Sequence, residues 1–130
     1  TGLEPCPSVV VTDWGCEAGY SAMCSLIDQH PTVTAVFAAS DRIAIGAMRA
    51  IADRGLVVPR DISVIGLDDI EVSPFQGPPL TTIRQSFTGM AKTALGILLQ
   101  MLASKEHSPS RVVLDPELVV RLSTGAPRPD

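Results

Sequence analysis

Polar side chains suited to bind a small hydroxylated molecule follow two apolar runs of this 130-residue sequence. Ser40 comes directly after the run at residues 35–39, and Asp68 and Asp69 come directly after the run at residues 63–67. A carboxylate accepts hydrogen bonds from hydroxyl groups, and a serine hydroxyl both donates and accepts them. Paired acids alone are weak evidence for hydrolysis, so this pattern favours ligand binding over bond cleavage.

Trp14, the only tryptophan, follows a third apolar run at residues 9–11. An indole face covers the apolar face of a sugar or a base while polar neighbours bind its hydroxyl groups. Each of these positions also has a simpler structural explanation. Trp14 can pack over a sheet edge, Ser40 can cap a helix, and the Asp68 carboxylate can be solvated. Asp69 is expected to cap a backbone group or to pair with a neighbouring side chain.

Alternating strands and helices must position these side chains. Residues 35–39 have the length of a strand, Ser40 has the hydroxyl of a helix N-cap, and apolar residues at helical spacing predict a helix over residues 41–54. Residues 63–67 predict the next strand. Two parallel strands joined by a helix bring both polar strand ends to one edge of the sheet, where open α/β folds bind ligands.

The rest of the chain continues this alternation. The pattern predicts a strand at residues 9–11, a helix over residues 16–29 and a long apolar helix over residues 87–102. Further strands are expected at residues 80–85, 111–114 and 117–122. This order predicts an α/β fold with a doubly wound parallel sheet and helices on both of its faces.

Composition excludes several classes of protein. The sequence is 45% hydrophobic and its mean hydropathy is positive, so it has enough apolar material for a core. Its 10 basic and 14 acidic residues give a net charge of −4, and the basic residues are scattered, whereas nucleic-acid binding needs a cluster. No apolar run approaches the ~18 residues of a membrane span, and no signal peptide is recognisable.

Motifs of enzymes and of metal proteins are missing from the sequence. Cys6, Cys16 and Cys24 lack a paired metal-binding spacing and favour free thiols in a reducing cytosol, and His30 and His107 stand alone in expected loops. We find no phosphate-binding glycine loop and no nucleophile elbow. We therefore expect no cofactor, no metal and no catalysis; a small doubly wound hydrolase or transferase is the least favoured alternative.

Five segments follow one another in a recognisable order and spacing: TDWGCEAGYSAM, TAVFAASDRIAIGAMRAI, GLVVPRDISVIGLDDIE, PPLTTIRQSF and ELVVRLST. Together they resemble the effector-binding region of the lactose repressor and galactose repressor family of bacterial transcription regulators, over nearly the whole chain. The resemblance implies a two-lobed, periplasmic-binding-protein-like (type I) fold in a cytoplasmic protein. It also implies a small effector of the sugar or nucleoside and purine class between the lobes, and a DNA-binding helix-turn-helix outside this sequence.

The resemblance implies these effector-binding residues: Trp14, Ser40, Asp68, Gln85 and Phe87. Trp14 matches the aromatic residue that stacks on the effector, and Asp68 matches the carboxylate that accepts hydrogen bonds from effector hydroxyls. The last two residues lie at the hinge of the cleft. Leu67 replaces a usual aromatic residue and Ser40 is shorter than the usual asparagine, so the pocket is expected to differ in shape and in hydrogen-bond donors.

Members of the family also form homodimers through the helix that starts near Asp41 and through the loop after Asp69. The resemblance therefore implies these interface residues: Ile45, Met48, Arg49, Ala52, Phe75 and Gln76. We interpret the face of this helix that carries Ile45 and Met48 as one that packing on the sheet does not need. An apolar ring in a proline-rich loop, as expected for Phe75, also suggests a contact with another chain.

The order of the motifs divides the chain into three parts. Residues 1–85 correspond to the C-terminal lobe of the effector-binding domain without its first strand and helix, residues 86–120 to a helix and strands of the other lobe, and residues 121–130 to a crossover strand and the tail. The missing strand is central in such sheets, so we expect an incomplete or rearranged lobe, or another chain in the gap. A periplasmic solute receptor of the same fold is the alternative function; the segment PPLTTIRQSF favours the regulator.

Overall fold

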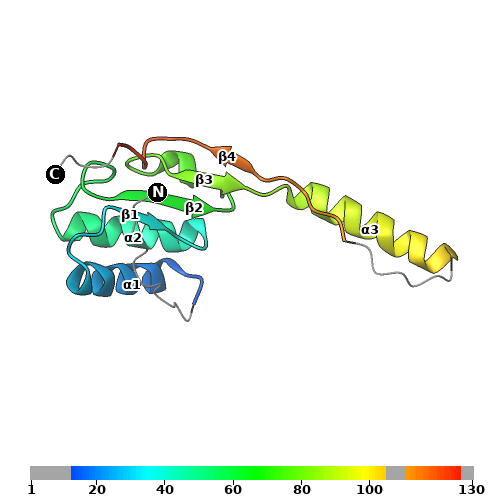
Figure 1. Cartoon of the computed structure of the whole chain (residues 1–130), viewed down its shortest axis with the longest axis horizontal. Helices are drawn as coiled ribbons and strands as arrows, with labels where there is room; N and C mark the ends of the chain where they lie inside the picture. Colours follow the sequence, from blue (N-terminus) through cyan, green and yellow to red (C-terminus); the bar gives the residue numbers. More distant parts are fainter. Residues whose placement is uncertain (1–12, 105–110, 127–130) are drawn as a thin grey trace.

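A computed structural model describes residues 13–104 and 111–126 of the chain. Figure 1 shows a lobe built on a four-stranded sheet, with one long helix extending away from it. The strands lie side by side in chain order: β1 (Ala35–Phe37), β2 (Ser63–Leu67), β3 (Thr81–Arg84) and β4 (Glu117–Val119). The first three are parallel, and β4 runs antiparallel to β3. The predicted α/β class is confirmed, with one antiparallel strand in an otherwise parallel sheet.

The described residues also form helices: α1 (Cys16–Gln29), α2 (Asp41–Asp53), the short 3-10 helix η1 (Ser73–Phe75) and α3 (Phe87–Ser104). α2 begins where Ser40 Oγ accepts a hydrogen bond from the Ile43 N–H over 3.2 Å, as expected for an N-cap. Shortly after it ends, Gly55 takes a left-handed conformation with φ 73°. The three long helices agree closely with the sequence prediction, whereas η1 is a new element. The predicted strand at residues 9–11, Cys6 and His107 lie outside the described residues.

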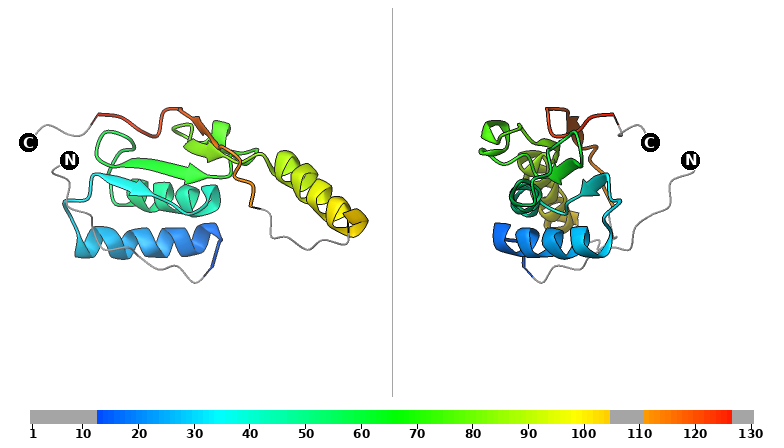
Figure 2. Two further views of the ribbon diagram at one scale, coloured as in Figure 1. Left: turned by 45° about the vertical axis from the view of Figure 1, so that its right-hand side comes forward. Right: turned by 90° about the vertical axis from the view of Figure 1, so that its left-hand side faces the viewer.

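α2 packs against the sheet and α1 packs against α2, on the same side of the sheet (Figure 2). The helices approach closely because glycines lie at their contact. A Cβ atom on Gly46 would lie only 1.9 Å from the Cys16 carbonyl oxygen. The sequence predicts helices on both faces, but the connection from β2 to β3 contains only η1. It therefore supplies no helix for the second face, whereas α2, which connects β1 to β2, packs on the first.

The core of the lobe lies between these two helices and the sheet. Its buried apolar residues are Met23, Ala38, Ile43, Ala44, Ala47, Met48, Ala50, Ile51, Val58, Ile62, Val64 and Leu80. Burial of each large aliphatic side chain stabilises the fold by about 1.5–3 kcal/mol. Cys16 and Cys24 are both on α1 and are free thiols, as predicted.

α3 extends beyond the lobe and exposes most of its apolar stripe (Figure 1). Leu98 is 52% exposed and Leu102 is 72% exposed. The prediction of a strand at residues 111–114 is wrong: this apolar segment is exposed and has no regular secondary structure, because no described strand lies beside it to supply hydrogen bonds. Among the helices that the structure describes, none is both long and apolar enough to cross a membrane.

β1 is an edge strand of the sheet in the described part of the chain, since it pairs with β2 alone. The Ala38 N–H donates to the Ile65 carbonyl oxygen of β2 over 2.9 Å. Backbone groups alternate in direction along a strand, so those of Ala35 and Phe37 point away from β2. Phe37 is 61% exposed. Within residues 13–104 and 111–126, no strand therefore pairs with β1 on the side where a further strand was predicted.

Candidate functional site

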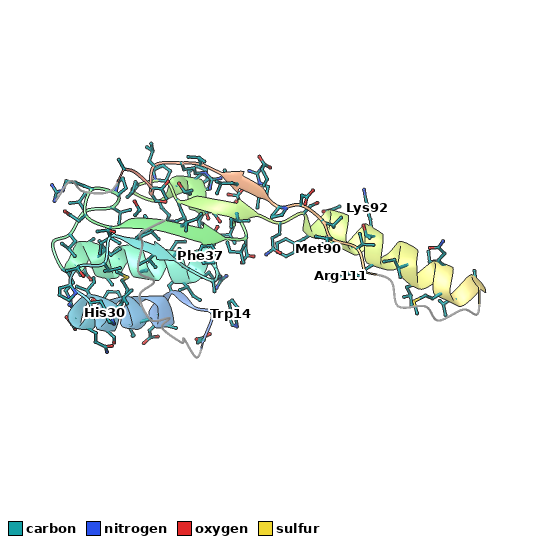
Figure 3. All side chains as sticks on the ribbon, in the orientation of Figure 1. Trp14, His30, Phe37, Met90, Lys92 and Arg111 are labelled. Carbon is teal, nitrogen blue, oxygen red and sulfur yellow. The ribbon has the colours of Figure 1, made fainter. Side chains whose placement is uncertain are left out.

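The carboxyl ends of the three parallel strands bring the sequence-predicted ligand residues to one edge of the sheet. Ser40 follows β1, Asp68 follows β2 and Gln85 follows β3. Trp14 lies just before α1, and Phe87 is the first residue of α3. Figure 3 shows Trp14 at the end of the lobe from which α3 departs. Three strands and two helices thus contribute to a single edge.

Asp68 is held in an unusual backbone conformation at this edge. Its φ is 110° and that of Asp69 is 54°, both in the left-handed region that non-glycine residues rarely adopt. Such residues cost about 1–3 kcal/mol each and cluster at binding sites. The Asp68 N–H donates to the Ile83 carbonyl oxygen over 2.8 Å, and Gln85 Nε2 donates to Asp68 Oδ1 over 3.0 Å. Among the described residues no group bonds to Asp68 Oδ2, which is free to accept a hydrogen bond from a ligand.

Asp69 has a different role from its neighbour. Its Oδ2 accepts from Arg84 Nε over 2.7 Å and its Oδ1 accepts from Arg121 Nη2 over 2.5 Å, and its side chain is only 8% exposed. Burial would raise the pKa of Asp69, but the hydrogen bonds from Arg121 and Arg84 outweigh it and hold that pKa below its usual range. Arg84 also bonds to Glu117 over 2.9 Å. The predicted pairing of Asp69 is confirmed, and it joins the ends of β2, β3 and β4.

Ser40 and Trp14 differ in how available they are to a ligand. Ser40 is 6% exposed and its Oγ already accepts the capping bond of α2, so its hydroxyl hydrogen and one acceptor lone pair are left. Trp14 is 67% exposed and Phe87 is 57% exposed, so each ring keeps most of its surface free for stacking. The assignment of these residues to an effector stays a prediction.

Asp41 is a functional candidate that the sequence reasoning missed. It is fully buried, and its Oδ1 accepts from Thr82 Oγ1 over 2.5 Å. Its Oδ2 accepts from Ser73 Oγ over 2.5 Å and from the Ile70 N–H over 3.0 Å. From the sequence it was only an acid suited to the first turn of a helix. A glycine in the middle of β2 was the available signal, because a Cβ atom on Gly66 would lie 2.2 Å from Asp41 Oδ1.

The predicted dimer residues gather on another surface, around a cavity of about 530 Å³ between α1, α2 and the loop after η1. Five of the six line it: Ile45, Met48, Arg49, Ala52 and Gln76. The sixth, Phe75, does not line it and is 82% exposed. A smaller cavity of about 260 Å³ is lined by Met48, Ala52, Leu56, Val57, Val58, Gly77 and Pro78. None of the predicted effector residues lines either cavity.

Met48 requires a correction. The sequence pattern placed it on a face that packing does not need, but it is only 8% exposed and belongs to the core. Gly77 and Pro78 line the smaller cavity with it, so the proline-rich loop lies close to its side chain. Arg49 is exposed, as predicted, and pairs with Asp53 over 2.8 Å on the same helix. Met48 therefore takes part in core packing, and its role in a dimer interface stays a prediction.

The described residues contain no group of three or more His, Cys, Asp and Glu side chains that is arranged to hold a metal ion. The carboxylates of Asp41 and Asp69 are instead bonded to hydroxyl, amide and guanidinium donors of the chain itself. What the edge offers to a ligand is a carboxylate oxygen, a hydroxyl and two exposed aromatic rings. This set recognises hydroxyl and amine hydrogens and apolar ring faces.

Comparison with known proteins gives consistent matches over most of the chain. Residues 2–124 match the family described as periplasmic binding protein-like domain. The chain is 43% identical over 110 residues to the HTH-type transcriptional repressor PurR of Haemophilus influenzae, a match that covers 82% of this chain and 33% of that protein. It is 45% identical over 108 residues to an uncharacterized HTH-type transcriptional regulator of Streptomyces limosus, covering 83% and 30%. The chain thus spans about a third of the length of the curated relatives it matches.

Solved structures give the same picture. The lac repressor dimer bound to operator and the anti-inducer ONPF matches with a TM-score of 0.80 and 38% identity, over 88% of this chain and 40% of that chain. A complex of the transcriptional regulator CelR with cellobiose matches with a TM-score of 0.80 and 36% identity, over 85% and 34%. A LacI-family regulator from Sanguibacter keddieii matches with a TM-score of 0.83 and 33% identity, over 91% and 44%.

Proposed function

Because this chain belongs to the periplasmic binding protein-like domain family, as part of the effector-binding region of a LacI-family regulator, we propose that it senses a small molecule and forms a dimer within a transcriptional repressor. The effector lies against the edge formed by Ser40, Asp68 and Gln85, between this lobe and a second one. Its binding changes the relative orientation of the two lobes and thereby the affinity for DNA. DNA contact belongs to a helix-turn-helix outside this chain, in a cytoplasmic protein.

The geometry of Asp68 is the observation that carries this proposal. The carboxylate follows β2 at the carboxyl edge of a parallel sheet, where open α/β folds bind ligands. Its Oδ1 is held by Gln85 over 3.0 Å, while Oδ2 has no partner among the described residues. A carboxylate that is fixed at one oxygen and open at the other is prepared to accept a hydroxyl or amine hydrogen.

A sugar, or a compound of the nucleoside and purine class, fits this edge best. Both kinds of molecule combine hydrogen-bond donors for Asp68 with a flat or apolar face that Trp14 can cover. Two of the similar proteins support this class, since one was solved with cellobiose and another, from Enterococcus faecium, with ribose. Enzyme function is disfavoured, because the curated relatives named above are transcriptional repressors and regulators.

The division of the chain belongs to the same proposal. Residues 1–85 form part of the C-terminal lobe, residues 86–120 pack into the other lobe of the intact protein, and residues 121–130 contain the crossover and the tail. The exposed apolar side chains of α3, such as Leu98 and Leu102, support this division, because a stripe of this kind needs a packing partner. Ile45, Arg49, Ala52, Phe75 and Gln76 contribute to the homodimer surface.

Isothermal titration of the intact regulator against a panel of cellobiose, lactose, ribose, adenine and adenosine tests the proposal. We expect at least one compound to bind, and Asp68→Ala to weaken that binding by roughly 30-fold or more, as for loss of a hydrogen bond to a charged group. The control is Glu71→Gln, an exposed acid three residues further along the same loop. Binding that survives Asp68→Ala unchanged would contradict the assigned edge. A panel without any binder would contradict the proposed effector class.

A further inference from the structure

We infer that Asp41 is a positioning residue that fixes the loop bearing Phe75 and Gln76 for contact with a second copy of this chain. The inference rests on the proposed dimer surface and adds a residue that does not belong to that surface. Asp41 does not line the large cavity and is fully buried. It acts through the backbone of the loop.

A single carboxylate connects three segments of the lobe. Asp41 lies in the first turn of α2, Thr82 lies in β3, and Ser73 opens η1 in the loop between β2 and β3. Both hydroxyls donate to the Asp41 carboxylate over 2.5 Å. A buried carboxylate is costly unless its oxygens receive hydrogen bonds. The fold therefore favours the one loop position in which Ser73 and the Ile70 N–H reach Asp41.

The bonded loop carries the exposed half of the proposed dimer surface. Ser73 is itself fully buried, and its carbonyl oxygen accepts from the Leu80 N–H over 2.9 Å. Phe75 follows only two residues later and is 82% exposed. Ser73 is thus an anchor on the inside of the loop, and Phe75 is presented on the outside.

α2 carries the other half of that surface. Ile45 and Arg49 lie one and two helical turns beyond Asp41, and both line the large cavity together with Gln76 of the loop. The helix is rigid over this distance, so the start of α2 sets the position of both side chains. The Asp41 carboxylate therefore aligns the helix half of the surface with the loop half.

The strand beside Asp41 is also adapted to this carboxylate. Gly66 lies in the middle of β2, and a Cβ atom there would lie 2.2 Å from Asp41 Oδ1 and 3.2 Å from Leu80 Cδ2. Glycine in a strand interior weakens the strand and often marks a place where another group approaches closely. Here the approaching group is the carboxylate that holds the loop. This second observation is independent of the hydrogen bonds and points to the same centre.

Asp41→Asn is the direct test, because asparagine keeps the shape but offers one acceptor oxygen in place of two. Ile51→Val is the matched control: Ile51 lies in the same helix, is equally buried and makes none of the loop hydrogen bonds. We expect Asp41→Asn to raise the dimer dissociation constant of the intact protein by about tenfold, measured by sedimentation at a temperature at which both variants are folded. Ile51→Val should change it by less than about twofold.

A double substitution separates positioning from general loss of stability. If Asp41 acts through Phe75, then Asp41→Asn should change the dissociation constant by less than about twofold in a Phe75→Ala background. The melting temperature should fall equally in both backgrounds. The inference would be overturned if Asp41→Asn lowered dimer affinity equally in the wild-type and Phe75→Ala backgrounds. It would also be overturned if Asp41→Asn alone left dimer affinity unchanged.

Amide hydrogen exchange tests the same role without requiring a dimer. The amides of Ile70, Ser73 and Phe75 should exchange at least about tenfold faster in Asp41→Asn, while those in the middle of α2 stay unchanged. Faster exchange throughout the lobe, or no change in the loop, would overturn the inference. A wild-type protein that stays monomeric would instead contradict the proposed dimer surface, and loop exchange would still decide the role of Asp41.

Discussion

Gln85 Nε2 lies 3.0 Å from Asp68 Oδ1 and donates a hydrogen bond to it, so the two predicted ligand residues contact each other before any ligand is present. They come from the ends of neighbouring parallel strands, β3 and β2. Asp68 has a backbone φ of 110°, and the hydrogen bond from Gln85 holds one oxygen of its carboxylate. A ligand-binding side chain that is already held in place lowers the entropic cost of binding.

This contact predicts that Gln85→Leu weakens effector binding without greatly changing the fold. Leucine has a similar size but cannot orient Asp68, so we expect the dissociation constant of the effector to rise by about fivefold to tenfold, as for loss of one hydrogen bond. Calorimetric titration with the compound that binds the wild type measures this. Thr88→Ala, an exposed change near the start of α3, is the control. An affinity equal to that of the wild type would show that Gln85 does not position Asp68.

The ion pairs of Asp69 predict a stability that depends on acid pH. Because the pKa of Asp69 is lower in the folded chain than in the unfolded chain, its contribution is complete above the unfolded pKa and is lost as pH falls through the folded pKa. We expect Asp69→Asn to destabilise the protein by about 1–2 kcal/mol at pH 7. Urea unfolding at a series of pH values should show a smaller difference below pH ~3. A difference that does not vary with pH would contradict this account.

Gly66→Ala should destabilise the lobe strongly. The added Cβ atom would lie 2.2 Å from Asp41 Oδ1, so either β2 or the carboxylate has to move, and overpacking of this kind costs about 1–3 kcal/mol. Gly96→Ala is the control, because a Cβ atom there meets nothing within 4 Å. In the interior of α3 that change should stabilise the helix by about 0.5–1 kcal/mol. Opposite shifts in the denaturant midpoints of the two variants test the pair.

Phe75→Ala should weaken the homodimer. An 82% exposed aromatic ring, next in sequence to the cavity-lining Gln76, is a typical anchor at an interface, and its truncation costs about 1–3 kcal/mol of association free energy. Sedimentation velocity across a dilution series measures the dissociation constant. Val72→Ala changes an exposed apolar residue of the same loop that is less exposed than Phe75 and is not one of the predicted interface residues, and it serves as the control. If both variants dissociate alike, Phe75 is not the anchor.

Local patterns predicted the elements that hold the site. The bounds of α1 and β2 and the capping role of Ser40 follow from apolar spacing and from the chemistry of helix ends, both of which act over a few residues. The gathering of Asp68 and Gln85 at one edge follows from the parallel order of the strands. These features need no knowledge of distant contacts.

Features that depend on distant contacts could not be predicted from the sequence. Asp41 bonds to groups 29, 32 and 41 residues away, and no local pattern indicates such partners. Met48 has the helical spacing of a surface residue, but the proline-rich loop lies close to its side chain. Residues 111–114 have the composition of a strand, but a strand forms only beside a partner with free backbone groups.

Within residues 13–104 and 111–126, the side of β1 that faces away from β2 has no partner strand, and this has a practical consequence for preparations of the protein. Exposed backbone groups at the edge of a sheet, next to an apolar ring such as Phe37, are a template on which other chains add as strands and aggregate. β1 is only three residues long. Residues 35–39 include no charged side chain that would repel an added strand. A lysine in place of Ala35 would supply that repulsion and should keep concentrated solutions clear for longer.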